Sequence, residues 1–345
     1  MADGQGPDAL GWLRRRWERL RPGPAPAPTP APRVAVVTDS AAALPTEWAD
    51  AFLQLGCFAV VDLPVMAGDE IFTEGADVDT ALSLALAAGR PVRTSRPAPG
   101  QFERVYRGFE DAGFEAVVSL HLSGKLSGTA DAARLAAQRV GIPVEVVDSR
   151  SAAMALGFAV RDAVRAAEAG ADADGVQSAA LARLAGSEVL FYVPSLEQLR
   201  RGGRIGAAAS LVGTMLSIKP LLTLREGLIV PLERVRTAAR AVQRLQELAA
   251  SAVSALDPAE VAVHYFGNRP EAEEFAWTLA RSVGKEADDV VLSPLPAVLA
   301  AHTGLGVLAV VIARAAVGGQ DVPADAPAAG DNWSSTAPVR GGLST

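Results

Sequence analysis

Short apolar runs alternate with alanine-rich segments of helical periodicity through the first half of the chain. The apolar runs lie at Val34–Val37, Ala116–Leu122 and Val144–Val147. The helical patterns that follow them cover residues 46–55, 129–139 and 151–169. Fully apolar strands separated by helices are typical of a parallel sheet that is covered on both faces. The pattern therefore predicts an α/β domain, with any ligand bound beyond the carboxyl ends of its strands.

The second half of the chain has a different rhythm. Strands are predicted at Val189–Val193, 221–224, 228–230, 261–266 and 307–312. Two of them flank Arg225-Glu226-Gly227, which is typical of a hairpin turn. A long helix is expected from about Thr237 to Leu256, and Asn268 is expected to cap another that has Pro270 in its first turn. This order predicts a second α/β or α+β domain with a mixed sheet.

Composition divides the chain into four parts. Residues 1–32 combine Trp12, Trp17 and several arginines with a proline-rich linker, and are expected to be a disordered extension. The alternative is a short helix that makes peripheral contact with an anionic membrane surface. Residues 33–165 and 166–315 are expected to form an N-terminal and a C-terminal α/β domain, and residues 316–345 a disordered tail rich in glycine, proline and alanine.

Charge and composition narrow the function. The 345 residues carry a formal net charge of −7, which argues against nucleic acid as a partner because phosphate binding needs excess cationic charge. Cys57 is the single cysteine, which excludes an intramolecular disulfide, and the three histidines lack metal-binding spacing, so no metal site is predicted. With no apolar leader and no transmembrane run, a cytoplasmic protein is expected, and its alanine-, arginine- and proline-rich composition suggests a bacterial source.

One cation stands in an unusual setting. A helical pattern from Leu196 breaks at Gly202-Gly203, places Arg204, and continues as small and apolar residues to Lys219. A guanidinium binds a carboxylate as a fork of donors, so Arg204 beside an apolar wall suggests a site for an apolar carboxylic acid. The wall would consist of residues 206–210 with Leu211, Val212, Met215, Leu216 and Ile218. Ordinary core packing explains the same apolar residues.

Three hydroxyl-rich loops offer further polar groups. They contain Thr94 with Ser95, Ser127 with Thr129, and His302-Thr303-Gly304. Exposed amides at the start of the helix after Ser127 would favour an anion. The alternatives are structural, because Ser and Thr at such junctions are often helix caps, as at Thr129 and Ser40, and a histidine before a glycine turn is often only a hydrogen-bonding residue.

Several known catalytic and nucleotide-binding motifs do not match the sequence. Ser123-Gly124-Lys125 resembles the end of a phosphate-binding loop, but Leu126 replaces the Ser or Thr that would bind magnesium. No nucleophile elbow and no zinc-protease motif occur, and nothing in the sequence specifies a Ser-His-Asp triad. The chain therefore has no recognisable nucleotide site.

The order and the amino-acid sequences of the loops resemble those of the DegV family between about residues 33 and 315. The segments that carry the resemblance are VTDSAAALP, TSRPAPGQF, HLSGKLSGTADAA, VVDSRSAAMALG, LEQLRRGGRIGAAASLVGTMLSIKPLLTLREGLIVPLERVRT and HTGLG. Members are bacterial fatty-acid-binding proteins that serve as the lipid-carrying subunit of fatty acid kinase. The resemblance implies a two-domain α/β fold, with a long-chain fatty acid enclosed between the domains.

The resemblance also implies the residues around the ligand's carboxylate. At the matching positions of this sequence they are Thr94 with Ser95, Ser127, Arg204 and His302. Of these, Arg204 and His302 would also assist the reaction of the carboxylate. Ser123 is a further candidate in the same loop, where the family often has a serine at the position of Gly124. Arg96 and Ala98 replace a glutamine and a serine common in the family, changes expected at the entrance or the partner surface.

By resemblance, the fatty acid carboxylate attacks the γ-phosphoryl group of ATP held by a separate kinase subunit, and acyl-phosphate forms. ATP and magnesium would belong to that partner, and this chain would bind only the fatty acid. A basic helix face, Arg236, Arg240 and Arg244, would either dock the partner or be simply solvated. The alternatives are a fatty-acid carrier without a kinase, and an acyl hydrolase that uses Ser127 and His302.

Overall fold

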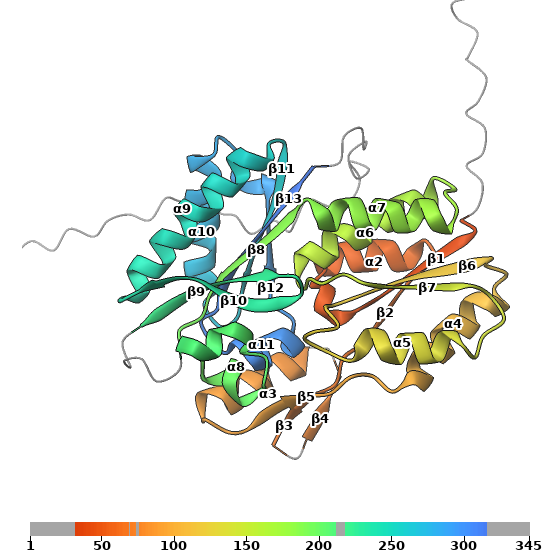
Figure 1. The fold of residues 1–345 in the computed structure, drawn as a ribbon, viewed down its shortest axis with the longest axis horizontal. Coiled ribbons are helices and arrows are strands. Elements are labelled where there is room, and N and C mark those ends of the chain that lie inside the picture. The colour runs from red at the N-terminus through yellow and green to blue at the C-terminus, as the bar shows by residue number, and fades with distance from the viewer. Residues whose placement is uncertain (1–31, 69, 74–75, 212–217, 316–345) are drawn as a thin grey trace, which may run out of the picture.

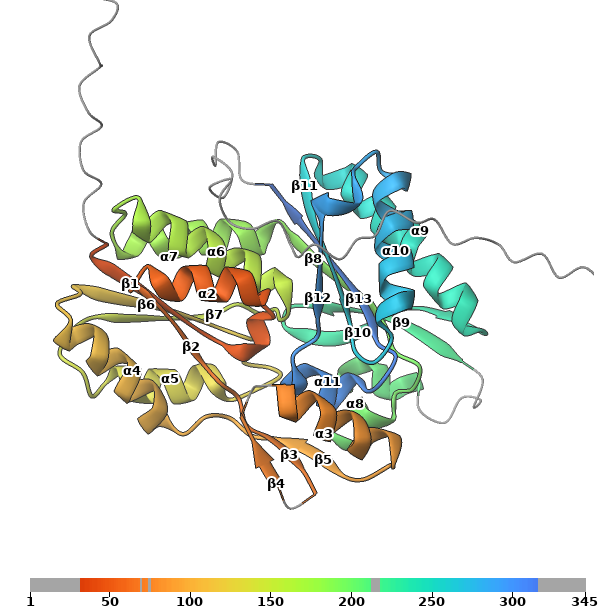
Figure 2. The same cartoon turned by 180° about the vertical axis from the view of Figure 1, so that it is seen from behind.

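The computed structural model describes residues 32–68, 70–73, 76–211 and 218–315. The predicted N-terminal extension and C-terminal tail lie outside the described residues, apart from residue 32 at the border of the first, and so do the proposed wall residues Val212, Met215 and Leu216. The described chain forms three sheets with helices around them (Figures 1 and 2).

The first sheet is parallel, as predicted. Its order is β2-β1-β6-β7, formed by β1 (Val34–Asp39), β2 (Phe58–Val61), β6 (Ala116–His121) and β7 (Val144–Asp148). Alternate residues of β1 face opposite sides, so both sides are apolar and need covering. One side is covered by α2 (Thr46–Gln54), α6 (Met154–Glu168) and α7 (Ala173–Ala185), and the other by α4 (Pro99–Asp111) and α5 (Thr129–Ala137) (Figure 1).

The second sheet is mixed, also as predicted. Its order is β10-β9-β8-β13-β11-β12, with only β11 and β12 parallel. The strands are β8 (Ser187–Tyr192), β9 (Lys219–Arg225), β10 (Leu228–Val235), β11 (Ala259–Tyr265), β12 (Val290–Pro294) and β13 (Leu308–Arg314). α9 (Ala238–Leu256) and α10 (Arg269–Ser282) pack on one face, and the other face joins the core of the first sheet. The α/β fold with two such sheets is thereby confirmed.

A small third sheet was not predicted. It has the order β4-β3-β5 and consists of β3 (Val65–Ala67), β4 (Glu70–Phe72) and β5 (Val92–Thr94). Three residues are too few to show a period, so these strands are invisible in the hydrophobic pattern. The sheet packs with α3 (Ala76–Ala87) against α11 (Ala297–Thr303), and α11 also contacts α8 (Glu197–Arg201). Segments distant in sequence therefore meet around α11 (Figure 2).

Two helix starts differ from the predictions. Thr237 caps α9 by accepting a 3.2 Å hydrogen bond from Arg240 N, and Asn268 stands at the N-cap of α10 with Pro270 in its first turn, although its side chain accepts from Phe266 N and not from a helix amide. The residue at the cap of α5 is Gly128, so Thr129 is not the cap. Asp39 caps the short 3₁₀ helix Ser40–Ala42, while the Ser40 hydroxyl accepts from Leu63 N.

An ion-pair network joins the two halves of the molecule. Arg161 of α6 donates two 2.6 Å hydrogen bonds to Glu260 of β11, and Arg183 of α7 pairs with Glu260 and with Asp162. The side chains of both arginines are at least 96% buried. The expected domain boundary after residue 165 remains a prediction, and that position falls inside α6, which contacts both large sheets.

Candidate functional site

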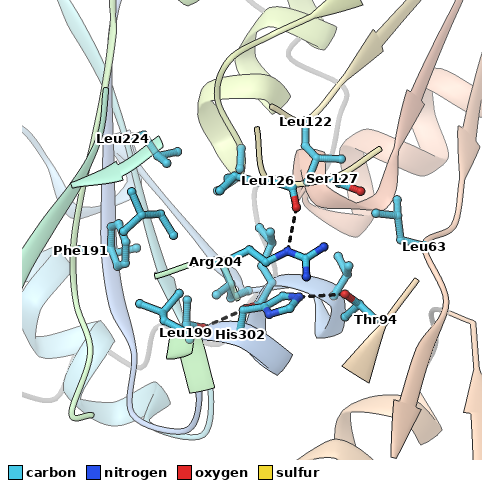
Figure 3. Close-up of a pocket in the computed structure, with 18 of the residues that line it drawn as sticks. Leu63, Thr94, Leu122, Leu126, Ser127, Phe191, Leu199, Arg204, Leu224 and His302 are labelled. Carbon is cyan, nitrogen blue, oxygen red and sulfur yellow. Dashed lines mark hydrogen bonds between the residues drawn. The ribbon is translucent and has the colours of Figure 1, made fainter. Parts of the chain in front are cut away.

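A cavity of about 250 Å³ lies where the two large sheets and the small sheet meet. It lies beyond the carboxyl ends of β6 and β7, the edge that the sequence pattern indicated, and next to the end of β5, a strand that the pattern does not predict. Most of its wall is apolar, and residues from both halves of the chain contribute (Figure 3). The apolar wall includes Leu63, Leu122, Leu126, Ala152, Ala153, Val189, Phe191, Leu199, Leu224, Ile229, Leu295, Val298, Leu299, Val307 and Ala309. Residues 206–209 and Ile218, which the sequence suggested as wall, are not among them.

All five polar residues proposed from the sequence line this cavity: Thr94, Ser95, Ser127, Arg204 and His302. They come from the small sheet, the loop after β6, the segment after α8, and α11. His302 was expected in a loop before the last strand, and this is wrong, because it lies in the last turn of α11. Helix α11 packs against α8, and the ring of His302 lies against Gly202 at the end of α8.

The glycine pair after α8 positions Arg204. Gly203 has a left-handed φ of +71°, its N–H donates to Arg200 O, and Arg204 N donates to Leu199 O. These two bonds form a Schellman motif, which ends a helix with glycine in the left-handed conformation. The chain therefore turns sharply after α8 and directs the side chain of Arg204 into the cavity.

The Arg204 guanidinium is tied to the backbone on both sides. Its Nε donates to Leu126 O at 2.9 Å and its Nη1 to Gly202 O at 2.6 Å. Figure 3 shows the guanidinium between the loop that carries Ser127 and the ring of His302. These bonds fix the cation in place, so it can meet a carboxylate without losing much rotamer freedom.

His302 lies between Gly202 and Thr94. Its Nε2 is 2.8 Å from Thr94 Oγ1, and its Nδ1 is buried with no hydrogen-bond partner among the described residues. Burying an N–H group without an acceptor costs more free energy than burying a ring nitrogen without a donor. We therefore assign the proton to Nε2 and leave Nδ1 unprotonated. Nε2–H then donates to Thr94 Oγ1, and this leaves the Thr94 hydroxyl hydrogen available for an acceptor in the cavity.

The charge state of His302 follows from its setting. Burial, and then the positive charge of Arg204, lower the pKa of His302 to about 4. The imidazole is therefore neutral at physiological pH and serves as a hydrogen-bonding group. Arg204 supplies the positive charge beside it.

We expect Arg204→Gln to raise the pKa of His302, because a protonated ring would no longer face a neighbouring cation. The measurement is an NMR titration of the two imidazoles. His264 is an internal control: its pKa is also lowered to about 4, but by burial alone, with a hydrogen bond to the Ser293 carbonyl opposing the shift. The pKa of His264 should not change in the variant. An unchanged pKa of His302 would show that the side chains of Arg204 and His302 do not interact.

The two serines of the loop after β6 have different surroundings. Ser127 Oγ lies 2.8 Å from Thr129 Oγ1, and either hydroxyl can donate; with Thr129 as the donor, Ser127 has its own hydrogen free for a ligand. Ser123 does not line the cavity, and its hydroxyl donates to Gly227 O in the β9–β10 turn. Ser123 therefore joins the loop to the hairpin, and its sequence-based assignment as a ligand residue has no support from this geometry.

A Ser-His-Asp arrangement does occur, away from the cavity. His121 Nδ1 is 2.9 Å from Asp39 Oδ2, its Nε2 is 2.8 Å from Ser119 Oγ, and Ser119 in turn bonds to Tyr106 OH at 2.7 Å. All four residues are completely buried. No substrate can reach Ser119, so this chain of hydrogen bonds joins β1, β6 and α4 and is structural.

Arg240 and Arg244 of the predicted basic face lie on α9 and pair with carboxylates of the chain, whereas Arg236 precedes this helix, which begins at Ala238. Arg244 bonds to Glu233 and Glu247, and Arg240 lies 3.4 Å from Glu247. The use of this face for docking an acidic partner remains a prediction. None of the described helices carries an apolar stretch long enough to cross a membrane.

Comparisons with known proteins agree with this fold and site. A sequence model of the DegV family, described as a family of uncharacterised proteins, matches residues 33–315. A DegV domain-containing protein of Streptomyces coelicolor is 47% identical over 280 residues, which cover 81% of this chain and 98% of that protein. A Mycobacterium tuberculosis relative is 37% identical over 224 residues, which cover 65% of this chain and 79% of its own.

Solved structures resemble it over most of its length. A fatty-acid-binding DegV family protein from Thermus thermophilus has a TM-score of 0.74 and 31% identity, and covers 82% of this chain and 100% of its own. DegV from Bacillus subtilis, described as a fatty acid binding protein, has a TM-score of 0.73 and 27% identity, and covers 82% and 99%. The fold and site thus define an α/β protein with two large sheets and a small one, and with an apolar cavity that carries a polar cluster. The chain belongs to the DegV family.

Proposed function

We propose that this protein binds a long-chain fatty acid, with the tail in the apolar cavity and the carboxylate at Thr94, Ser95, Ser127, Arg204 and His302. The observation that carries the proposal is the convergence of hydroxyls, a guanidinium and a neutral imidazole on one part of a mostly apolar wall. The two fatty-acid-binding relatives named above support it, because each shares the fold over most of this chain.

The two ends of a fatty acid make opposite demands on a site. Burying a tail of roughly 15 methylenes is worth about 12 kcal/mol before costs. The carboxylate leaves water at a cost of several kcal/mol unless donors replace it. Thr94 and Ser127 supply hydroxyl donors, and Arg204 supplies a charge-assisted donor. His302 acts through Thr94, whose hydroxyl it orients.

The proposal extends to a role in phosphoryl transfer. The bound carboxylate would be presented to a separate ATP-dependent kinase subunit, and one of its oxygens would attack the γ-phosphorus as the bond to ADP breaks. This chain would position the nucleophile and stabilise charge, while ATP and magnesium are held by the partner. Burial and the charge of Arg204 lower the pKa of His302 to about 4, so its neutral ring is a weak base, and the acid would react in the ionised form that it already has at physiological pH.

Ligand extraction tests the binding step. Protein purified from cells should release about one equivalent of fatty acid into organic solvent, identified by mass spectrometry. Protein that releases none, and that binds no added fatty acid, would refute the proposal. Reconstitution with the kinase subunit and ATP then distinguishes the kinase role from a stand-alone carrier, because only the former yields acyl-phosphate.

An acyl hydrolase based on Ser127 and His302 has no support from the hydrogen bonds. His302 Nε2 bonds to Thr94 and not to Ser127, and Ser127 bonds to Thr129. A nucleophilic serine needs a base within hydrogen-bond reach. A variant with Ser127→Ala should therefore lose fatty acid affinity, and neither it nor the wild type should hydrolyse an acyl ester.

A further inference from the structure

Arg96 is a second guanidinium in the wall of the cavity. It follows β5, two residues after Thr94, and its side chain is exposed while it lines the cavity. The side chain crosses Gly128, the residue that caps α5: a Cβ atom added to Gly128 would be 3.1 Å from Arg96 Nη1 and 3.2 Å from its Cδ. The guanidinium therefore lies next to Ser127, on the solvent side of the polar cluster.

Arg96 differs from Arg204 in how it is held. Arg204 donates two hydrogen bonds to backbone carbonyls. Among the described residues, Arg96 has no hydrogen bond and no ion pair, although it contacts Gly128. An exposed cation at the mouth of a cavity, with its donors uncommitted, can receive an anionic group that projects outward from the site.

The proposed reaction adds negative charge at this place. A fatty acid carboxylate carries one negative charge, which Arg204 can balance. When its oxygen bonds to the γ-phosphorus and ADP leaves, the acyl-phosphate keeps the acyl group and gains a phosphoryl group with close to two negative charges. The acyl tail holds the carbonyl end in place, so the phosphoryl group must project from the carboxylate toward the mouth.

We propose that Arg96 binds the phosphoryl group of the acyl-phosphate formed at this site, and that Arg204 serves the acyl end. The inference rests on the proposed function above. A guanidinium presents paired N–H donors that match two phosphoryl oxygens, which a single hydroxyl cannot do. The amide groups in the first turn of α5, close to Arg96, favour the same negative charge.

A 2-oxoalkylphosphonate with the acyl chain of the extracted fatty acid is a stable probe, because a methylene replaces the bridging oxygen of the acyl-phosphate while the carbonyl and a doubly charged phosphonate are kept. Binding of this probe and of the fatty acid is measured by calorimetry on delipidated full-length protein at mildly alkaline pH. We expect Arg96→Gln to weaken phosphonate binding about tenfold, one charge-assisted contact at an exposed site, and to change fatty acid binding less than about twofold.

Arg93→Gln is the matched control. Arg93 is an exposed arginine on β5, three residues before Arg96, and it does not line the cavity. The Arg93→Gln variant has the same change in net charge as Arg96→Gln, but the change lies outside the cavity. Its affinities for the phosphonate and for the fatty acid should therefore stay close to those of the wild type. Equal losses in the two variants would show a general charge effect and overturn the assignment to Arg96.

The outcomes separate this inference from the proposed function. If wild-type protein binds fatty acid, but Arg96→Gln binds the phosphonate as tightly as the wild type does, the role of Arg96 is refuted and the fatty-acid site stands. An equal loss of both ligands in Arg96→Gln would place Arg96 at the carboxylate and also refute the inference. If wild-type protein binds neither ligand, the proposed function fails with it.

Discussion

Replacing Glu260 by alanine is expected to destabilise the folded chain by about 3 kcal/mol. Glu260 accepts two hydrogen bonds from Arg161 and lies 2.6 Å from Arg183 Nη1. Both guanidiniums have side chains that are almost fully buried, with exposed fractions of 4% and 1%. Removing Glu260 leaves one carboxylate, Asp162, for two buried cations, and an unbalanced buried charge is far more costly than a lost surface pair.

The loss should stay near the lower end of the range for broken buried pairs, because Glu260 is itself 31% exposed and water can reach the space it leaves. The free energy of unfolding is measured by urea titration followed by circular dichroism. Glu260→Gln should reduce the free energy of unfolding less than Glu260→Ala does, since the amide keeps one acceptor for the arginines. The network joins α6 and α7 to β11, so the effect should appear as reduced global stability.

Glu273→Ala serves as the control for this prediction. Glu273 pairs with Arg269 at 2.8 Å on the outer face of α10, with side chains that are 37% and 61% exposed. Such a pair is worth about 0.5 kcal/mol. A loss in Glu260→Ala no larger than in Glu273→Ala would show that the buried network adds nothing to stability.

Gly202→Ala is expected to lower fatty acid affinity at least about tenfold, or about 1.4 kcal/mol. Gly202 has a helical φ of −76°, which alanine adopts readily, so the backbone does not oppose the change. A Cβ atom there would lie 2.1 Å from His302 Nδ1 and 2.7 Å from its Cε1. The ring must move away, and the 2.8 Å contact between Nε2 and Thr94 Oγ1 is lost.

Gly203→Ala is the matched control, one residue further along. A Cβ atom added to Gly203 would meet no atom of the described residues within 4 Å, but the φ of +71° disfavours alanine by about 1 kcal/mol. This variant should lose stability and keep its affinity, measured by displacement of a fluorescent fatty acid. Gly202→Ala should show the opposite pattern. Equal affinity in both variants would refute the positioning of Thr94 by His302.

Parts of the site could be read from the sequence, because their signals are local. Gly202-Gly203 indicated a helix end, and Arg204 followed it as an isolated cation among small residues. The loop that carries Ser127 was placed at a strand end by the apolar run Ala116–Leu122 before it. Arg96 was noticed only as a departure from the family's usual sequence at this position. Gly202 was noticed only as part of the helix end, because the imidazole that it contacts belongs to His302, which is far away in the sequence.

By itself, the sequence determined many of the long strands and helices, because burial on one or both faces imposes a period on a single stretch of chain, whereas α3, α7, β2 and β12 were not predicted from it. It also determined the kinds of polar group available to the site. Tertiary structure decided which of them meet. The three-residue strands of the small sheet carry no period, yet β5 brings Thr94 to α11 and so to His302. Contacts of this kind depend on how whole elements pack, and no local pattern records them.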